Sequence, residues 1–116
     1  MNPEQLLKIL EDLGIKRLDA QVYLLLATEE PKKGREISNE LRINKPQLYS
    51  ILRKLQNKGL VTVSPEHPAR FSAILFDKVL DLLITAKREQ AKAIQASREE
   101  LLSSWRKMVK DKPEKS

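Results

Sequence analysis

Apolar residues recur at intervals of three and four along most of the chain, the spacing that places them on one face of a helix. Asn2 and Asn44 are each followed three residues later by glutamine, which is the spacing of a capping box at a helix start. Gly14 and Gly59 are residues that end a helix readily. Tyr23 is expected beside the apolar stripe of the second helix. The helices expected on these grounds cover residues 3–13, 17–27, 34–41, 45–58 and 77–109.

Two short segments after the fourth helix alternate between apolar and polar residues, the pattern of half-buried strands. These segments, residues 60–64 and 70–74, flank a turn whose tip contains Pro65, His67 and Pro68. The pattern therefore predicts a hairpin with an exposed loop, or wing.

The two helices before this hairpin are joined by a tight turn at residues 42–45, which is the arrangement of a helix-turn-helix. A helix hairpin inside an ordinary core is the alternative, but the hairpin that follows favours a winged helix. The expected fold class is mainly α with a small β-hairpin (α+β): a winged helix-turn-helix followed by a long C-terminal coiled-coil helix.

The helix at 45–58 has two distinct faces. Leu48, Ile51, Leu52 and Leu55 share one face and are expected in the core. The second helix of a helix-turn-helix lies in the DNA major groove, so the opposite face is expected to read base edges. Arginine matches guanine and glutamine matches adenine. The expected base contacts are Pro46, Gln47, Tyr49, Ser50 and Arg53.

Positive charge is concentrated in the middle of the chain. The net charge is +6, and residues 31–63 alone contain eight basic and two acidic side chains. Basic charge gathered on one short segment is the electrostatic footprint of a polyanion-binding surface. The expected phosphate contacts are Lys32, Lys33, Arg35, Lys45, Lys54 and Arg70.

The composition offers little for catalysis or metal binding. The chain has no cysteine, one histidine and three glycines, which leaves no Cys-His pair, histidine-rich metal site or glycine-rich phosphate loop. We therefore expect no enzyme activity, no cofactor and no metal, and the sequence points to no small-molecule effector. The apolar runs are too short to span a bilayer and the start of the chain does not read as a signal peptide, so a cytoplasmic, nucleoid-associated protein is expected.

Several short sequences resemble a known family. Leu48-Tyr49 with Leu52 and Leu55, the run at 58–61 (KGLV) and the run at 68–73 (PARFSA) are similar to the winged-helix domain of archaeal TrmB-like transcriptional regulators. The resemblance covers about residues 5 to 84 and implies regulation of transcription in an archaeon. Many members of that family carry a large sugar-binding domain after the winged helix. Here about forty residues of a different character follow the wing, so sugar sensing is not expected to carry over.

The C-terminal helix has an apolar stripe that steps by three and four, typical of a coiled-coil seam. Exposed in water, such a stripe normally marks a partner surface, so a homodimer is expected. Lys87 and Arg98 interrupt the stripe, either as side chains that reach solvent at its margin or as polar positions that set the register. Folding back onto the winged helix is the competing use, more suited to residues 79–83. The expected interface residues are Ile84, Ala91, Ile94, Leu101, Trp105 and Met108.

The expected organisation is a winged-helix domain at residues 1–76, a dimerisation helix at 77–110 and a polar tail at 111–116. The leading function is a dimeric regulator that binds double-stranded DNA. A sequence-tolerant chromatin protein and a winged-helix module that binds an acidic protein partner remain as alternatives, since one fold hosts several functions.

Overall fold

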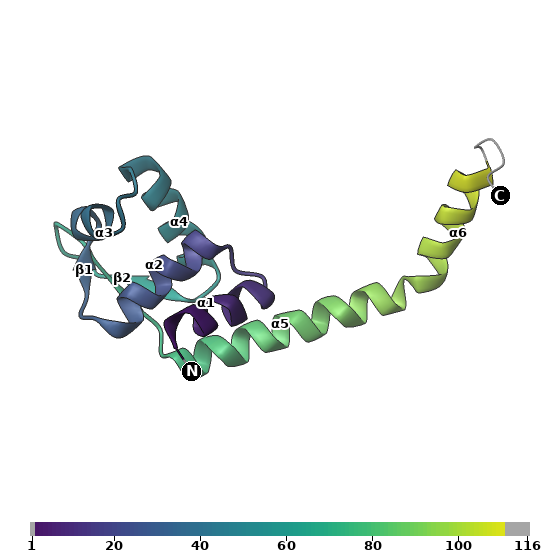
Figure 1. Ribbon diagram of the computed structural model, residues 1–116, viewed down its shortest axis with the longest axis horizontal. Coiled ribbons are helices and arrows are strands. Elements are labelled where there is room, and N and C mark those ends of the chain that lie inside the picture. The colour runs from purple at the N-terminus through teal and green to yellow at the C-terminus, as the bar shows by residue number, and fades with distance from the viewer. Residues whose placement is uncertain (1, 111–116) are drawn as a thin grey trace. The chain divides into compact units, whose positions relative to one another are not determined.

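The computed structural model describes residues 2–110, so the expected polar tail at 111–116 lies outside the described residues. The described chain divides into two compact units, with the boundary between residues 84 and 85. The elements in chain order are α1 (Pro3–Asp12), α2 (Arg17–Thr28), β1 (Lys32–Lys33), α3 (Gly34–Leu41), α4 (Lys45–Asn57), β2 (Val61–Val63), β3 (Arg70–Ala73), α5 (Phe76–Ala96) and α6 (Arg98–Lys110) (Figure 1).

The predicted helices of the first unit are confirmed to within one residue at each end. At α1 the capping box is complete, because Asn2 Oδ1 accepts from the Gln5 N–H at 2.9 Å and Gln5 Oε1 accepts from the Asn2 N–H at 2.8 Å. At α4, Asn44 Oδ1 accepts from the Gln47 N–H at 2.9 Å. The reciprocal bond from the Gln47 side chain is absent within residues 2–110, so only half of that predicted box forms.

The sheet differs from the predicted hairpin in having a third strand. β2 and β3 pair antiparallel with Val61 opposite Ala73, as the alternation predicted, and β1 pairs with the other edge of β3 with Lys32 opposite Phe71. The strand order is therefore β1-β3-β2. A two-residue strand is too short to show a period in the sequence, which is why it was not predicted.

The core of the first unit is formed by one face of each helix and the inner side of the sheet. The four residues predicted to face inward from α4 are all buried. Val79 and Leu83 of α5 are buried as well, which agrees with the prediction that this part of the C-terminal segment packs on the winged helix. Tyr23, which was expected beside the apolar stripe of α2, is fully buried, and its hydroxyl donates to the Ile74 carbonyl at 2.7 Å.

The C-terminal segment is helical, but it is not the single helix that the sequence predicted. α5 ends at Ala96, Ser97 adopts a turn, and α6 begins at Arg98. The helical ladder resumes where the Leu101 N–H donates to the Ser97 carbonyl at 2.9 Å. Ser97 followed by Glu100 has the spacing of a capping box, so the sequence contained a start signal that the uninterrupted apolar stripe obscured.

Among residues 2–110, no helix combines the length and the apolar character that crossing a membrane requires.

Candidate nucleic-acid interface

The outer face of α4 is polar and open to solvent. Pro46, Gln47, Tyr49, Ser50 and Arg53 are all exposed, whereas the opposite face is buried. Within the described part of the chain, the side chains of Gln47, Ser50 and Arg53 make no hydrogen bond or ion pair with another residue. Their donors and acceptors are therefore available to a ligand.

The turn that precedes α4 is fixed by local hydrogen bonds. Arg42 ends α3 in the left-handed region, with φ 55° and ψ 48°. The Ile43 N–H donates to the Ser38 carbonyl at 3.1 Å, and the Ser38 hydroxyl donates to the Ile43 carbonyl. These bonds tie the first residues of the turn back onto α3, so the start of α4 is held in a defined position beside it.

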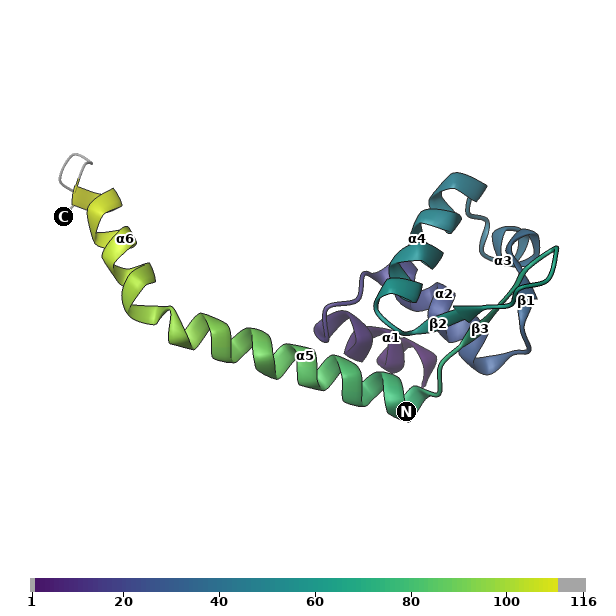
Figure 2. The same ribbon diagram turned by 180° about the vertical axis from the view of Figure 1, so that it is seen from behind.

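Three elements that are far apart in the sequence meet around one cavity of about 240 Å³. The loop between β2 and β3 lies beside α3 in both views of the molecule (Figure 1, Figure 2). Three basic residues line the cavity, Lys33 at the end of β1, Arg35 at the start of α3 and Lys45 at the start of α4, and the lining contains no acidic residue. Its lining residues are Lys33, Gly34, Arg35, Lys45, Tyr49, Pro68, Ala69 and Phe71.

Tyr49 forms one wall of this cavity and is held by two contacts. Its ring packs edge-on against Phe71 of β3, with 6.2 Å between the ring centroids and 63° between the planes. Its hydroxyl lies so close to Gly34 that a Cβ added there would be 2.2 Å from the oxygen. Gly34 thus leaves the space that Tyr49 occupies, and 42% of Tyr49 remains exposed.

Charges at the start of α3 are partly compensated by one carboxylate. Glu36 Oε1 accepts from the Lys33 N–H at 2.8 Å, which lowers the pKa of the Glu36 carboxyl. The nearby charges of Arg70, Lys32 and Lys33 lower the pKa of Glu36 further. Glu36 therefore stays ionised near neutral pH and accepts a hydrogen bond from the backbone of Lys33, one of the residues that line the cavity.

Lys32 and Lys54, both predicted to contact phosphate, are instead bound to carboxylates. Lys32 Nζ lies 2.9 Å from Glu29 and 3.5 Å from Glu40, its side chain is only 14% exposed, and these partners raise its pKa. Lys54 Nζ lies 3.1 Å from Asp19, whose side chain is 7% exposed. Asp19 lies on α2 and Glu40 on α3, so those two pairings depend on tertiary packing, whereas Glu29 lies only three residues before Lys32 in the sequence.

The wing residues Pro65, His67 and Pro68 are exposed at the tip of the hairpin. Its base is closed by two hydrogen bonds of 2.9 Å, from the Ser64 N–H to the Arg70 carbonyl and from the Arg70 N–H to Ser64 Oγ. The Arg70 side chain is exposed where the hairpin joins the sheet.

In the described residues, histidine, cysteine and acidic side chains form no group of three or more that could hold a metal ion. The structure thus brings together Lys33, Arg35, Lys45, Tyr49 and Pro68 from the predicted set. The sequence analysis did not predict that Gly34 and Phe71 take part in this cavity. A glycine directly after two lysines at a helix start was the signal for a close approach there.

Comparisons with known proteins find similarity to transcriptional regulators. Residues 10–77 match the family model described as sugar-specific transcriptional regulator TrmB. The HTH-type sugar sensing transcriptional regulator TrmBL1 of Pyrococcus furiosus is 26% identical over 99 residues, which cover 82% of this chain and 29% of that protein. This chain therefore spans less than a third of the length of that relative.

Solved structures share the fold. ST1889 of the archaeon Sulfolobus tokodaii is 24% identical with a TM-score of 0.62, covering 75% of this chain and 97% of that one. TrmBL2, described as an archaeal chromatin protein with a novel mode of DNA binding, is 20% identical with a TM-score of 0.70, covering 97% of this chain and 45% of that one. The regulator Tm0710 of Thermotoga maritima is 19% identical with a TM-score of 0.56, covering 89% and 79%. Because the family model matches more than half of the sequence, this winged-helix chain belongs to the TrmB family of transcriptional regulators.

Proposed function

We propose that this chain is a transcriptional regulator that binds double-stranded DNA as a homodimer, with no catalytic step. α4 enters the major groove, and the wing with Pro65, His67 and Pro68 lies against the backbone. The observation that carries the proposal is the cavity at which the starts of α3 and α4 meet the wing, because it gathers three cations without a carboxylate beside the exposed polar face of α4.

Base edges are assigned to the outer face of α4. Arg53 can donate two hydrogen bonds to guanine, and Gln47 can pair with adenine through its amide. Gln47 is suited to this because the second half of its capping box does not form. Tyr49 presents its hydroxyl beside these residues, and Pro46 and Ser50 complete the face at the helix start, where a recognition helix meets the bases.

Phosphates are assigned to Lys33, Arg35, Lys45 and Arg70. The first three line the cavity, and the N-terminal turns of α3 and α4 add backbone N–H groups and a favourable dipole. Lys32 and Lys54 are left out of this set, because their ammonium groups already bind Glu29 and Asp19.

Salt dependence of binding tests the phosphate assignment. The affinity of the full chain for a labelled duplex is measured by fluorescence anisotropy at a series of salt concentrations. The triple variant K33Q/R35Q/K45Q should flatten the slope of log affinity against log salt by about 0.9 for each lost contact. The control K8Q/K16Q/K78Q removes the same charge from exposed positions outside the cavity and should keep most of the slope. Equal slopes for the two triple variants would refute the assignment.

Sequence preference tests the base assignment. Selection from a random duplex pool identifies the preferred site of the wild type, and Arg53→Ala should then lose about 1–3 kcal/mol on that site while keeping its affinity for unrelated duplexes. Lys8→Ala serves as the control and should keep the preference. If the wild type binds all duplexes equally, the chromatin-like role is supported in place of an operator-specific one. If it binds no duplex at moderate salt, the DNA proposal fails.

A further inference from the structure

The second unit presents an apolar stripe that is exposed along the described residues 85–110. From residue 84 to residue 110, no side chain is buried. Beyond Ile84, the large apolar residues of the stripe are more than half exposed, with Ile94 at 57%, Leu101 at 55% and Trp105 at 56%. An exposed apolar stripe of this length normally marks a surface that binds a partner.

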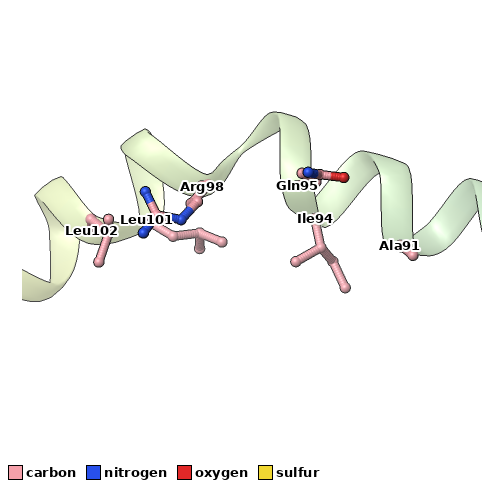
Figure 3. A pocket seen from close by; sticks show the side chains of 6 residues that line it. All are labelled: Ala91, Ile94, Gln95, Arg98, Leu101 and Leu102. Carbon is pink, nitrogen blue, oxygen red and sulfur yellow. The ribbon is translucent and has the colours of Figure 1, made fainter.

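The break at Ser97 does not interrupt this stripe. One apolar cavity of about 470 Å³ is lined from both sides of the break, by Ala91 and Ile94 of α5 and by Arg98 and Leu101 of α6. Ile94 and Leu101 extend to the same side of the chain (Figure 3). Four successive positions of the three-and-four pattern thus share one surface, so the helix pair offers a single continuous seam.

We infer that a second copy of this chain covers the seam in antiparallel orientation, with the pairing symmetric about Ala96. This inference rests on the homodimer proposed above and adds its orientation and register. The positions of the seam are spaced symmetrically about Ala96, so each one faces a seam position of the partner when the copies run in opposite directions. The layers pair Ile84 with Met108, Lys87 with Trp105, Ala91 with Leu101, and Ile94 with Arg98.

Charge decides against the parallel arrangement. In a parallel, in-register pair each seam residue meets its own copy, which would set Lys87 against Lys87 and Arg98 against Arg98 inside the interface. Like charges in a desolvated interface are strongly unfavourable. In the antiparallel register Lys87 meets the face of Trp105, a favourable cation–π partner, and the aliphatic stem of Arg98 covers Ile94.

Size and register support the same pairing. The small side chain of Ala91 leaves a hollow at the cavity, and the facing Leu101 supplies the volume that fills it, whereas a parallel pair would set alanine against alanine. Sliding one copy by seven residues in one direction brings Lys87 opposite Arg98. Sliding it in the other direction pairs Ala91 with Met108 and leaves Ile84 and Lys87 without a partner in the seam. The symmetric register alone uses the whole stripe without facing charges.

Engineered disulfides test the orientation and register of the two copies. Because the chain has no cysteine, any disulfide must form between the introduced cysteines. Single variants A91C and L101C of the full chain are oxidised separately and as an equimolar mixture, and the products are identified by mass spectrometry. The expected result is a mixed A91C–L101C dimer and little cross-linking of either variant alone, because facing seam positions bring their Cβ atoms within disulfide distance. A96C lies on the outer side of the helix pair and should give no covalent dimer.

Other cross-linking patterns would overturn the inference. Efficient A91C–A91C and L101C–L101C dimers indicate a parallel pair, and a preferred A91C–M108C product indicates the shifted register. The pair I84C and M108C tests the outermost layer and replaces the first pair if L101C weakens the dimer. Sedimentation of the cysteine-free wild type distinguishes a failure of the homodimer proposal from a failure of the register. If the wild type is a monomer, the homodimer proposal is wrong. If it is a dimer but the mixed disulfides do not form, only the antiparallel register is wrong.

Discussion

At the scale of the residue, the exposure of the α4 side chains was predictable and their partners were not. The 3.6-residue period of the helix dictates which side of α4 faces the core once Leu48 and Leu55 are recognised as apolar anchors. By contrast, Lys54 looked like a free cation at the edge of the outer face. Its partner Asp19 lies on α2, and only the packing of α2 against α4 brings the two together.

Lys54 should therefore stabilise the fold rather than grip DNA. Lys54→Met leaves the nearly buried Asp19 carboxylate without its counterion, and we expect a loss of about 1–3 kcal/mol in the free energy of unfolding, less than for a fully buried pair because Lys54 is 44% exposed. The double variant D19N/K54M should recover most of that loss. Urea denaturation measures both. A flattened salt dependence of DNA binding with unchanged stability would instead return Lys54 to the phosphate contacts.

Tyr23 couples stability to alkaline pH. Burial, followed by the charge of Asp77, raises the pKa of its hydroxyl from 10.0 to about 12. The folded state thus favours the neutral phenol, and this stabilisation is complete below pH 10. Between pH 10 and about 12 the unfolded chain loses the proton first, so stability should fall by roughly 1.4 kcal/mol per pH unit from this group.

Tyr23→Phe isolates that contribution. The variant also leaves the Ile74 carbonyl without its donor, which should cost about 1–3 kcal/mol at neutral pH. Chemical denaturation across pH 8 to 12 should show that the gap between wild type and variant closes as pH rises. A gap that stays constant over this range contradicts a raised Tyr23 pKa.

At the scale of the element, the helices and the two longer strands, β2 and β3, could be predicted because the repeat of apolar residues in each extends over several positions. The two-residue strand β1 is too short to show such a repeat. β1 matters for the candidate interface, because its pairing with β3 places Gly34 directly next to the ring of Tyr49. The close packing of Gly34 against Tyr49 is a tertiary contact between two helices, so the sequence alone could not show which side chain would occupy the space beside this glycine.

Gly34→Ala should lower the free energy of unfolding when Tyr49 is present and raise it when Tyr49 is replaced by alanine. The new methyl group would collide with the Tyr49 hydroxyl and ring, and overpacking of this kind costs about 1–3 kcal/mol. In a Tyr49→Ala background the collision is gone. Gly34 does not have a positive φ, so alanine there should then stabilise by about 0.4–1 kcal/mol by lowering the entropy of the unfolded chain.

A double-mutant cycle measured by thermal or urea unfolding checks this change of sign. The wild type, both single variants and the double variant are compared under one set of conditions. Additive effects of the two substitutions would mean that Gly34 and Tyr49 do not share the space assigned to them.

At the scale of the whole molecule, hydrophobic patterning changes from several short elements to one long stripe, which placed the expected boundary of the winged helix after residue 76. The chain divides into compact units after residue 84 instead, because Val79 and Leu83 of α5 are buried in the first unit. The break between α5 and α6 was missed because Ser97 is neither glycine nor proline and the stripe runs through it. The pairing of two copies concerns surfaces that lie in water in the single chain. The spacing of the stripe alone does not determine whether the two copies run parallel or antiparallel. The orientation is inferred from which residues would face each other across the interface.

The proposed dimer predicts that the two units can be separated by truncation. Residues 1–84 form a compact unit that contains every buried residue of the described chain, so a chain that ends after Lys87 should fold. It should be a monomer, because it lacks the seam from Ala91 to Met108. One recognition helix then binds alone, and the loss of the linked second site should weaken affinity for a two-half-site duplex by roughly 10²–10⁴-fold. The slope of log affinity against log salt should also fall to about half, because half of the phosphate contacts are lost.

Sedimentation measures the oligomeric state and anisotropy the affinity of the truncated chain, with a chain ending after Lys110 as the dimeric control. A truncated chain that still dimerises, or a control chain that is monomeric at micromolar concentration, contradicts an interface in the second unit.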